Sequence, residues 1–169
     1  KAFLKGAKRN SERKNRGVDR IDIAWDDAFG KSNLAEQIGQ ENVSRVVNKV
    51  GSNLLESDFR VVRIRTQAEG GAQGQRLAVV LSQSDTHSNS KDTLGIVTEN
   101  IDDNHEGFVT TFGNVSEIDT TGAKSFGGSE TWNDGDELYV SATNAGYLTK
   151  VKPTSPKHSI LVGWVVYAH

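Results

Sequence analysis

Short apolar or alternating runs, each bounded by turn residues, recur through the C-terminal two-thirds of the chain. They cover residues 59–65, 77–81, 94–98, 108–112, 115–118, 137–141, 147–151 and 160–167. A period of two places successive side chains on opposite faces of a strand. Turn pairs such as Gly113-Asn114 and Asp134-Gly135 separate the runs at intervals of roughly ten residues. The pattern predicts a mainly β fold, a small antiparallel β-barrel or sandwich of about eight short strands. Since no segment suits a crossover helix, a parallel α/β sheet is not expected.

Residues 32–50, ahead of these runs, follow a helical pattern instead. Ser32 is a candidate N-cap for a first helical piece. A second piece, residues 41–50, carries a β-branched apolar stripe and ends at Gly51. β-branched residues at core positions favour trimeric coiled coils. Two interpretations stay open: a short helix packed on its own domain, or an oligomer contact. The candidate contact residues are Leu34, Ile38, Val43, Val46, Val47 and Val50.

Residues 1–30 form a polar arm in which only Ile21-Asp22-Ile23-Ala24-Trp25 alternates like a strand or docking segment. The net charge of the whole chain is -2, yet the arm is basic. Its bases are Lys1, Lys5, Lys8, Arg9, Arg13, Lys14, Arg16 and Arg20. Such an arm can contact a polyanion, dock on an acidic protein surface or stay solvated. Nucleic acid is disfavoured as the partner, because Phe3 is the one aromatic among the basic residues 1–20 and no nucleic-acid module follows.

The composition narrows the chemistry further. The chain has no Cys and no Met, which removes disulfides, thiolate nucleophiles and Cys-ligated zinc. Without an initiator Met, the chain is expected to be a piece of a longer or processed protein. No run reaches the roughly 18 apolar residues of a membrane span, so no membrane insertion is expected. The hydrophobic share of 35% is low for a globular chain, which suggests that partners or subunits complete its buried surface.

The candidate polar clusters favour turns over catalysis. Residues 102–106 (Asp-Asp-Asn-His-Glu) are dense in acids, but they lack the alternate ligand spacing of a calcium loop and close on Gly107. Asp134, Asp136 and Glu137 surround an Asp-Gly turn, and the sequence offers no cleft for a glycosidase pair. The histidines form no metal motif. We therefore expect no catalytic residue, cofactor or metal.

The aromatic residues leave a further alternative open. Flat rings can stack on sugars, which would make the chain a carbohydrate-binding module. The candidates are Trp132, Tyr139, Tyr147, Trp164 and Tyr167. Tyr139 and Trp164 lie inside apolar runs, however, so packing in a core or a subunit interface is the favoured interpretation.

Several ordered motifs resemble a β-domain of tailed-bacteriophage structural proteins of the tail-fibre type. They are Leu94-Gly-Ile-Val-Thr-Glu-Asn-Ile101, Glu106-Gly-Phe-Val-Thr-Thr-Phe-Gly113, Thr131-Trp-Asn-Asp-Gly-Asp-Glu-Leu-Tyr-Val-Ser141, Gly146-Tyr-Leu-Thr-Lys-Val-Lys-Pro153 and Pro156-Lys-His-Ser-Ile-Leu-Val-Gly-Trp-Val165. The resemblance covers about residues 59–169. Members of that family usually continue with a further strand, so the β-domain is expected to be truncated at its C-terminus. Residues 1–50 match nothing in the family.

The resemblance implies a homotrimeric, non-enzymatic virion component assembled in the bacterial cytoplasm, such as a tail-fibre or other appendage subunit. The expected organisation is a basic attachment arm (1–30), short helices (31–58) and a β-domain (59–169) serving as spacer or knob. A capsid-bound head fibre or decoration protein, and a module that binds host-surface glycan, remain alternatives. Particle docking is assigned to Lys5, Lys8, Arg9, Arg13, Lys14, Arg16, Ile21, Ile23 and Trp25.

Overall fold

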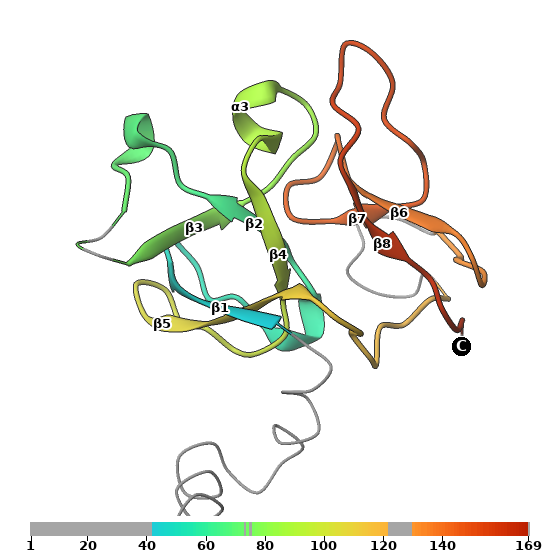
Figure 1. Ribbon diagram of the computed structural model, residues 1–169, viewed down its shortest axis with the longest axis horizontal. Coiled ribbons are helices and arrows are strands. Elements are labelled where there is room, and N and C mark those ends of the chain that lie inside the picture. The colour runs from blue at the N-terminus through green and yellow to red at the C-terminus, as the bar shows by residue number, and fades with distance from the viewer. Residues whose placement is uncertain (1–41, 73, 75, 122–129, 169) are drawn as a thin grey trace, which may run out of the picture. The chain divides into compact units, whose positions relative to one another are not determined.

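A computed structural model describes residues 42–72, 74, 76–121 and 130–168, all within a compact unit that runs from Glu41 to His169. Its strands are β1 (Asn42–Asn48), β2 (Val61–Ile64), β3 (Leu77–Leu81), β4 (Thr93–Val97), β5 (Glu106–Phe112), β6 (Glu137–Val140), β7 (Leu148–Thr149) and β8 (Leu161–Trp164). One short helix, α3 (His87–Ser90), and two 3-10 turns, Glu56–Asp58 and Gln67–Glu69, complete the described elements. Figure 1 shows β1–β5 wrapped into a barrel and β6–β8 forming a small sheet. The mainly β prediction is therefore confirmed.

The barrel closes in the order β1-β3-β2-β4-β5, with β5 pairing back onto β1. Every pair is antiparallel except β1 with β3. Closure removes free strand edges and encloses an apolar core. The enclosed core consists of Val46, Leu54, Val62, Val79, Val97, Ile101 and Val109.

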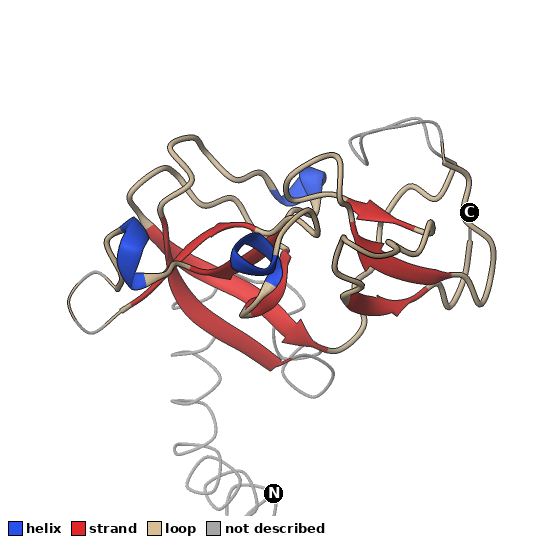
Figure 2. Cartoon of the chain, turned by 90° about the horizontal axis from the view of Figure 1, so that it is seen from above, coloured by secondary structure: helices blue, strands red, loops and turns tan. Residues whose placement is uncertain are grey.

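The second sheet has the order β7-β6-β8 and lies beside the barrel (Figure 2). A second core joins this sheet to the barrel. Trp132, 2% exposed, is the largest side chain in this core. Val61 of β2 reaches it from the barrel, because Val62, the next residue, points into the barrel interior. The remaining buried members are Leu138, Val140, Leu148 and Val165. One strand of the barrel thus contributes to both cores.

The prediction of a helix over residues 41–50 is wrong, because residues 42–48 form strand β1. Valines at positions 43, 46, 47 and 50 fit a helical stripe, but β-branched side chains also favour strands. Pairing with β5 and β3 decides between the two. The barrel consequently begins before Phe59, and the predicted first helical piece, with Leu34 and Ile38, lies outside the described residues.

Two other segments also differ from the sequence predictions. Residues 115–118 form no strand, because Glu117 has a left-handed backbone (φ 66°) that interrupts an extended chain. Ile118 still packs on the second core, which explains its apolar character. The predicted loop 82–92 contains α3, whose first turn is capped by the Thr86 hydroxyl accepting from the Asn89 amide at 3.3 Å.

Candidate functional site

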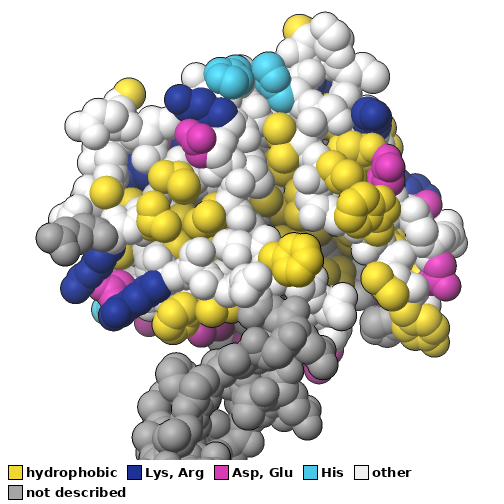
Figure 3. All heavy atoms as spheres, viewed as in Figure 1, with side chains coloured by type: hydrophobic (Ala, Val, Ile, Leu, Met, Phe, Trp, Pro, Cys, Tyr) yellow, Lys and Arg dark blue, Asp and Glu magenta, His cyan; other side chains and the backbone are white. Residues whose placement is uncertain are grey.

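An apolar groove of about 800 Å³ opens on the surface of the described residues. Its walls come from β4, the end of β5 with residues 113–118, and β8 with the residues after it. Its floor reaches the second core at Trp132, Leu138, Leu148 and Val165. Figure 3 shows hydrophobic side chains gathered around a hollow on this face of the molecule. Glu117 is the one acidic or basic residue among its lining residues, so the groove is suited to apolar rather than ionic contact.

Large apolar side chains stand exposed along the rim of this groove. Phe112 and Tyr167 are each 74% exposed, Trp164 is 61% exposed and Val166 is 81% exposed. Leu161, at the start of β8, is 42% exposed. Single exposed apolar residues are ordinary, but a contiguous patch beside a groove marks an interaction site.

A bulge in β8 explains why Trp164 faces outward. Glu137, Leu138 and Tyr139 of β6 are consecutive, yet they pair with Trp164, Gly163 and Leu161, which leaves Val162 as an extra residue. The extra residue reverses the alternation of faces along the strand. Val162 and Val165 therefore both pack toward the second core, although they are three residues apart, and Trp164 points away. Tyr139, by contrast, is buried as the sequence indicated.

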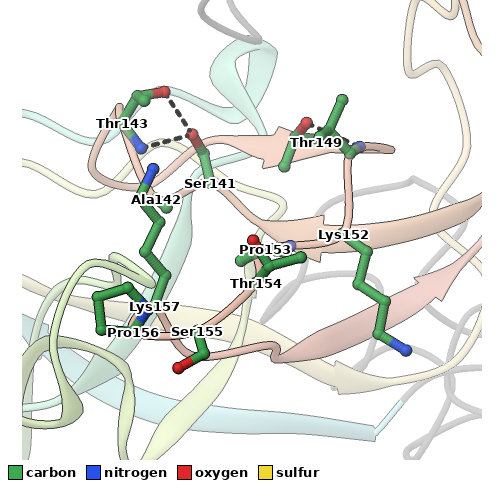
Figure 4. A pocket seen from close by; sticks show the side chains of 11 residues that line it. Ser141, Ala142, Thr143, Thr149, Lys152, Pro153, Thr154, Ser155, Pro156 and Lys157 are labelled. Carbon is green, nitrogen blue, oxygen red and sulfur yellow. Dashed lines mark hydrogen bonds between the residues drawn. The ribbon is translucent and has the colours of Figure 1, made fainter.

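A second, smaller hollow of about 250 Å³ lies beside β7 and residues 151–157 (Figure 4). Hydroxyl groups and the side chains of Lys152 and Lys157 line it. The Ser141 hydroxyl is already engaged, accepting from the Thr143 and Asn144 amides at 3.2 Å each. No carboxylate lines this hollow among the described residues.

The acidic residues of the Asp-Gly turn serve local structure. Asp134 Oδ1 accepts from the Ala168 amide at 2.7 Å and so fastens the chain after β8. Asp136 Oδ2 accepts from the Asn133 amide at 2.9 Å. Glu137 accepts from the Tyr139 hydroxyl, and this bond raises the pKa of Tyr139 above its ordinary value. These contacts agree with the predicted turn.

Glu130 is a structural residue that the sequence did not single out. Burial acts to raise the pKa of its carboxyl group, but three hydrogen bonds outweigh burial and hold that pKa below its ordinary value. The donors are the Thr149 hydroxyl (2.5 Å), the Trp132 indole (3.0 Å) and the Lys150 amide (2.9 Å). The carboxylate thereby joins β7 to the segment that carries the buried tryptophan.

The histidines and the acidic turn at 102–106 form no metal site in the described residues. The turn is present as predicted, with Asp103 Oδ1 accepting from the Gly51 amide at 3.1 Å. The rings of His87 and His158 lie 5.5 Å apart between α3 and the segment before β8. His105 lies apart from them and bonds through Nδ1 to the Asp103 carbonyl at 3.0 Å.

The structure separates the valines that were candidates for oligomer contact. Val46 and Val47 are buried, and Val46 belongs to the barrel core, against which Val50 also packs. Val43 alone is exposed, at 51%. The docking candidates Lys5, Lys8, Arg9, Arg13, Lys14, Arg16, Ile21, Ile23 and Trp25 lie outside the described residues.

Comparisons with protein-family models, with curated proteins and with solved structures find no match to this chain. Among the described residues, no helix is long and apolar enough to cross a membrane.

Proposed function

We propose that this chain is a non-enzymatic structural subunit of a tailed-bacteriophage particle, of the tail-fibre or a similar appendage type. The ordered motifs that resemble the phage family support the proposal. They cover β4 to β8, the strands that line or adjoin the apolar groove. In this role the β-domain is a spacer or knob and residues 1–30 attach it to the particle, with self-association, expected as a homotrimer, building the appendage.

The open apolar groove is the observation that carries this proposal. A subunit made for assembly exposes apolar surface while it is isolated and buries that surface against its neighbours. The groove has an apolar floor and a rim of exposed aromatic rings, and one carboxylate is its only charge. These features suit a protein–protein contact better than a site for a small polar substrate.

Immunogold electron microscopy of purified particles tests the proposal. Antibodies raised against residues 42–168 are expected to label an appendage of the phage that encodes the chain. Peptides of the chain should also be found when those particles are analysed by mass spectrometry. Particles that carry neither the label nor the peptides would refute a virion role.

A capsid-bound head fibre or decoration protein is the second candidate, favoured by the concentration of basic residues before position 21. In that case the arm binds an acidic capsid surface. A variant without residues 1–20 can be compared with the full chain for binding to empty capsids and to isolated tails. This comparison distinguishes attachment to the head from attachment to the tail. Loss of capsid binding alone would favour the head.

A host-glycan-binding module is the third candidate, favoured by the exposure of Trp164 and Tyr167. Exposed rings can stack on sugar faces. A glycan array carried out with wild-type chain and with Trp164→Ala distinguishes this role. Glycan binding that disappears in the variant would support it, whereas an array without hits would count against it.

A further inference from the structure

We infer that a second copy of this chain covers the apolar groove, with the rim side chains Phe112, Leu161, Trp164, Val166 and Tyr167 forming the contact between copies. The inference rests on the proposed function, since subunits of an appendage meet copies of themselves. It goes further by assigning the contact to one surface. We call this surface the β8 face.

The second core is open on the side of the β8 face. Trp132, Leu148 and Val165 are nearly fully buried, yet they also form part of the groove floor. Ile96, Ile160 and Val162 around them are only partly buried. The barrel core, in contrast, is closed by strand pairing all round. A partner over the groove would bury the apolar atoms that the three-stranded sheet leaves in water.

The area of the β8 face is a substantial part of what a stable interface requires. Aromatic side chains present about 150–250 Å² each, so the exposed fractions of Phe112, Trp164 and Tyr167 correspond to about 400 Å², to which Leu161 and Val166 add. A standard interface buries about 800 Å² on each partner. The groove walls would supply the remainder.

The charge and shape of the β8 face favour a second copy over other occupants. A strongly charged surface would repel its own copy and select an oppositely charged partner. Here Glu117 is the only acidic or basic side chain that lines the groove. The same surface also carries both a hollow and projecting rings, so one copy can fill the groove of the next.

The backbone of β8 supplies a further means of association. In the described part of the chain β8 pairs with β6 on one side only and forms an edge of its sheet. Edge strands present backbone donors and acceptors to a neighbouring chain. Contact between copies at β8 would cover this edge together with the exposed rings.

Size-exclusion chromatography with light scattering on the full chain tests the inference. The wild type should be an oligomer that dissociates on dilution, and Trp164→Glu should weaken self-association about 30-fold or more, as expected for a central aromatic residue. Val151→Glu is the matched control, because Val151 is 66% exposed and lies outside the groove. Circular dichroism establishes that both variants are folded. A monomeric wild type, or Trp164→Glu with unchanged self-association, overturns the inference.

Thiol protection gives a second measurement that does not depend on a disruptive variant. The chain has no Cys, so Val166→Cys and Val151→Cys each introduce a single thiol. Maleimide should react slowly with the thiol at 166 in the oligomer and rapidly after dilution, while the thiol at 151 reacts rapidly in both. A thiol at 166 that stays reactive in the oligomer overturns the inference. Protection that persists in the diluted monomer also overturns it, since the occupant would then belong to the same chain.

The self-association experiments and the particle-labelling experiment can fail independently of each other. A chain that labels the virion but does not associate through the β8 face would refute this inference and leave the proposed function standing. A chain that associates through the β8 face but is absent from particles would refute the proposed function alone.

Discussion

Replacing Gly95 with Ala should destabilise the barrel strongly, although it adds only one methyl group. A Cβ at this position would lie 2.1 Å from the carbonyl oxygen of Thr110 and 3.2 Å from the Cα of Thr111. Both atoms belong to the backbone of β5, which is held by pairing with β1 and β4. The clash therefore cannot be relieved by rotation of a side chain.

The expected magnitude follows from the displacement that the methyl group requires. The Cβ of an alanine at position 95 would lie about 1 Å closer to the Thr110 carbonyl oxygen than carbon and oxygen tolerate. Strands β4 and β5 must therefore separate by roughly that amount where they pair. Overpacking of this kind costs about 3 kcal/mol, which corresponds to a fall in Tm of roughly 10 °C for a domain of this size.

Gly163→Ala provides a matched control for this prediction. Gly163 also lies in a strand, β8, and a Cβ there would have no heavy atom within 4 Å other than those of Gly163 and its two chain neighbours. Thermal denaturation followed by circular dichroism compares the two variants with wild type. If Gly95→Ala melts within 2–3 °C of Gly163→Ala, about what 1 kcal/mol produces, the close approach of β4 to β5 is not real.

Three further variants test other parts of the structure. In urea denaturation, Val46→Ala should lower the free energy of unfolding by about 2 kcal/mol and Val43→Ala by less than about 0.5 kcal/mol. The reason is that only Val46 is buried in the barrel core. Equal effects of the two substitutions would contradict the assignment of strand β1. The Arg63 guanidinium lowers the pKa of Glu69 from 4.5 to about 2. The stability that wild type holds over Glu69→Gln should therefore be full at neutral pH and disappear as pH falls from about 5 to 2, measured by urea titration at each pH. Trp132→Phe should cost about 2 kcal/mol in the same assay, because the indole hydrogen bond in the second core is lost.

Most strands could be predicted from the sequence because their signals are local. The runs at 77–81, 94–98, 108–112 and 137–141 coincide within one or two residues with β3, β4, β5 and β6. Each run is bounded by turn residues, and these set where an extended segment must end. The sequence of residues 42–48 does not distinguish a helix from a strand, because its valines fit a helical period and also favour strands. Its partners, at positions 77–79 and 106–112, lie far along the chain, so no local pattern could resolve the choice.

The groove could not be predicted, for a reason of the same kind. The apolar run at 160–167 predicts a strand, and an unbroken alternation would place Trp164 on the same face as Val162. The register of β8 with β6 determines which residue of β8 is extra. The sequence of either strand by itself does not determine that register. The low hydrophobic share suggests that a partner completes the burial, but it does not indicate which surface the partner would cover.

The corrected strand β1 also changes which surface can join copies of the chain. The valine stripe was the first candidate, but Val46 contributes to the barrel core and Val50 packs against it. A contact made by these residues would require the barrel core to open, and exposing that core would destabilise the fold. Trp164 and its neighbours need no such rearrangement, because they are exposed in the folded unit. Under this proposal copies of the chain meet through the part that resembles phage β-domains, and the basic arm is left for attachment to the particle.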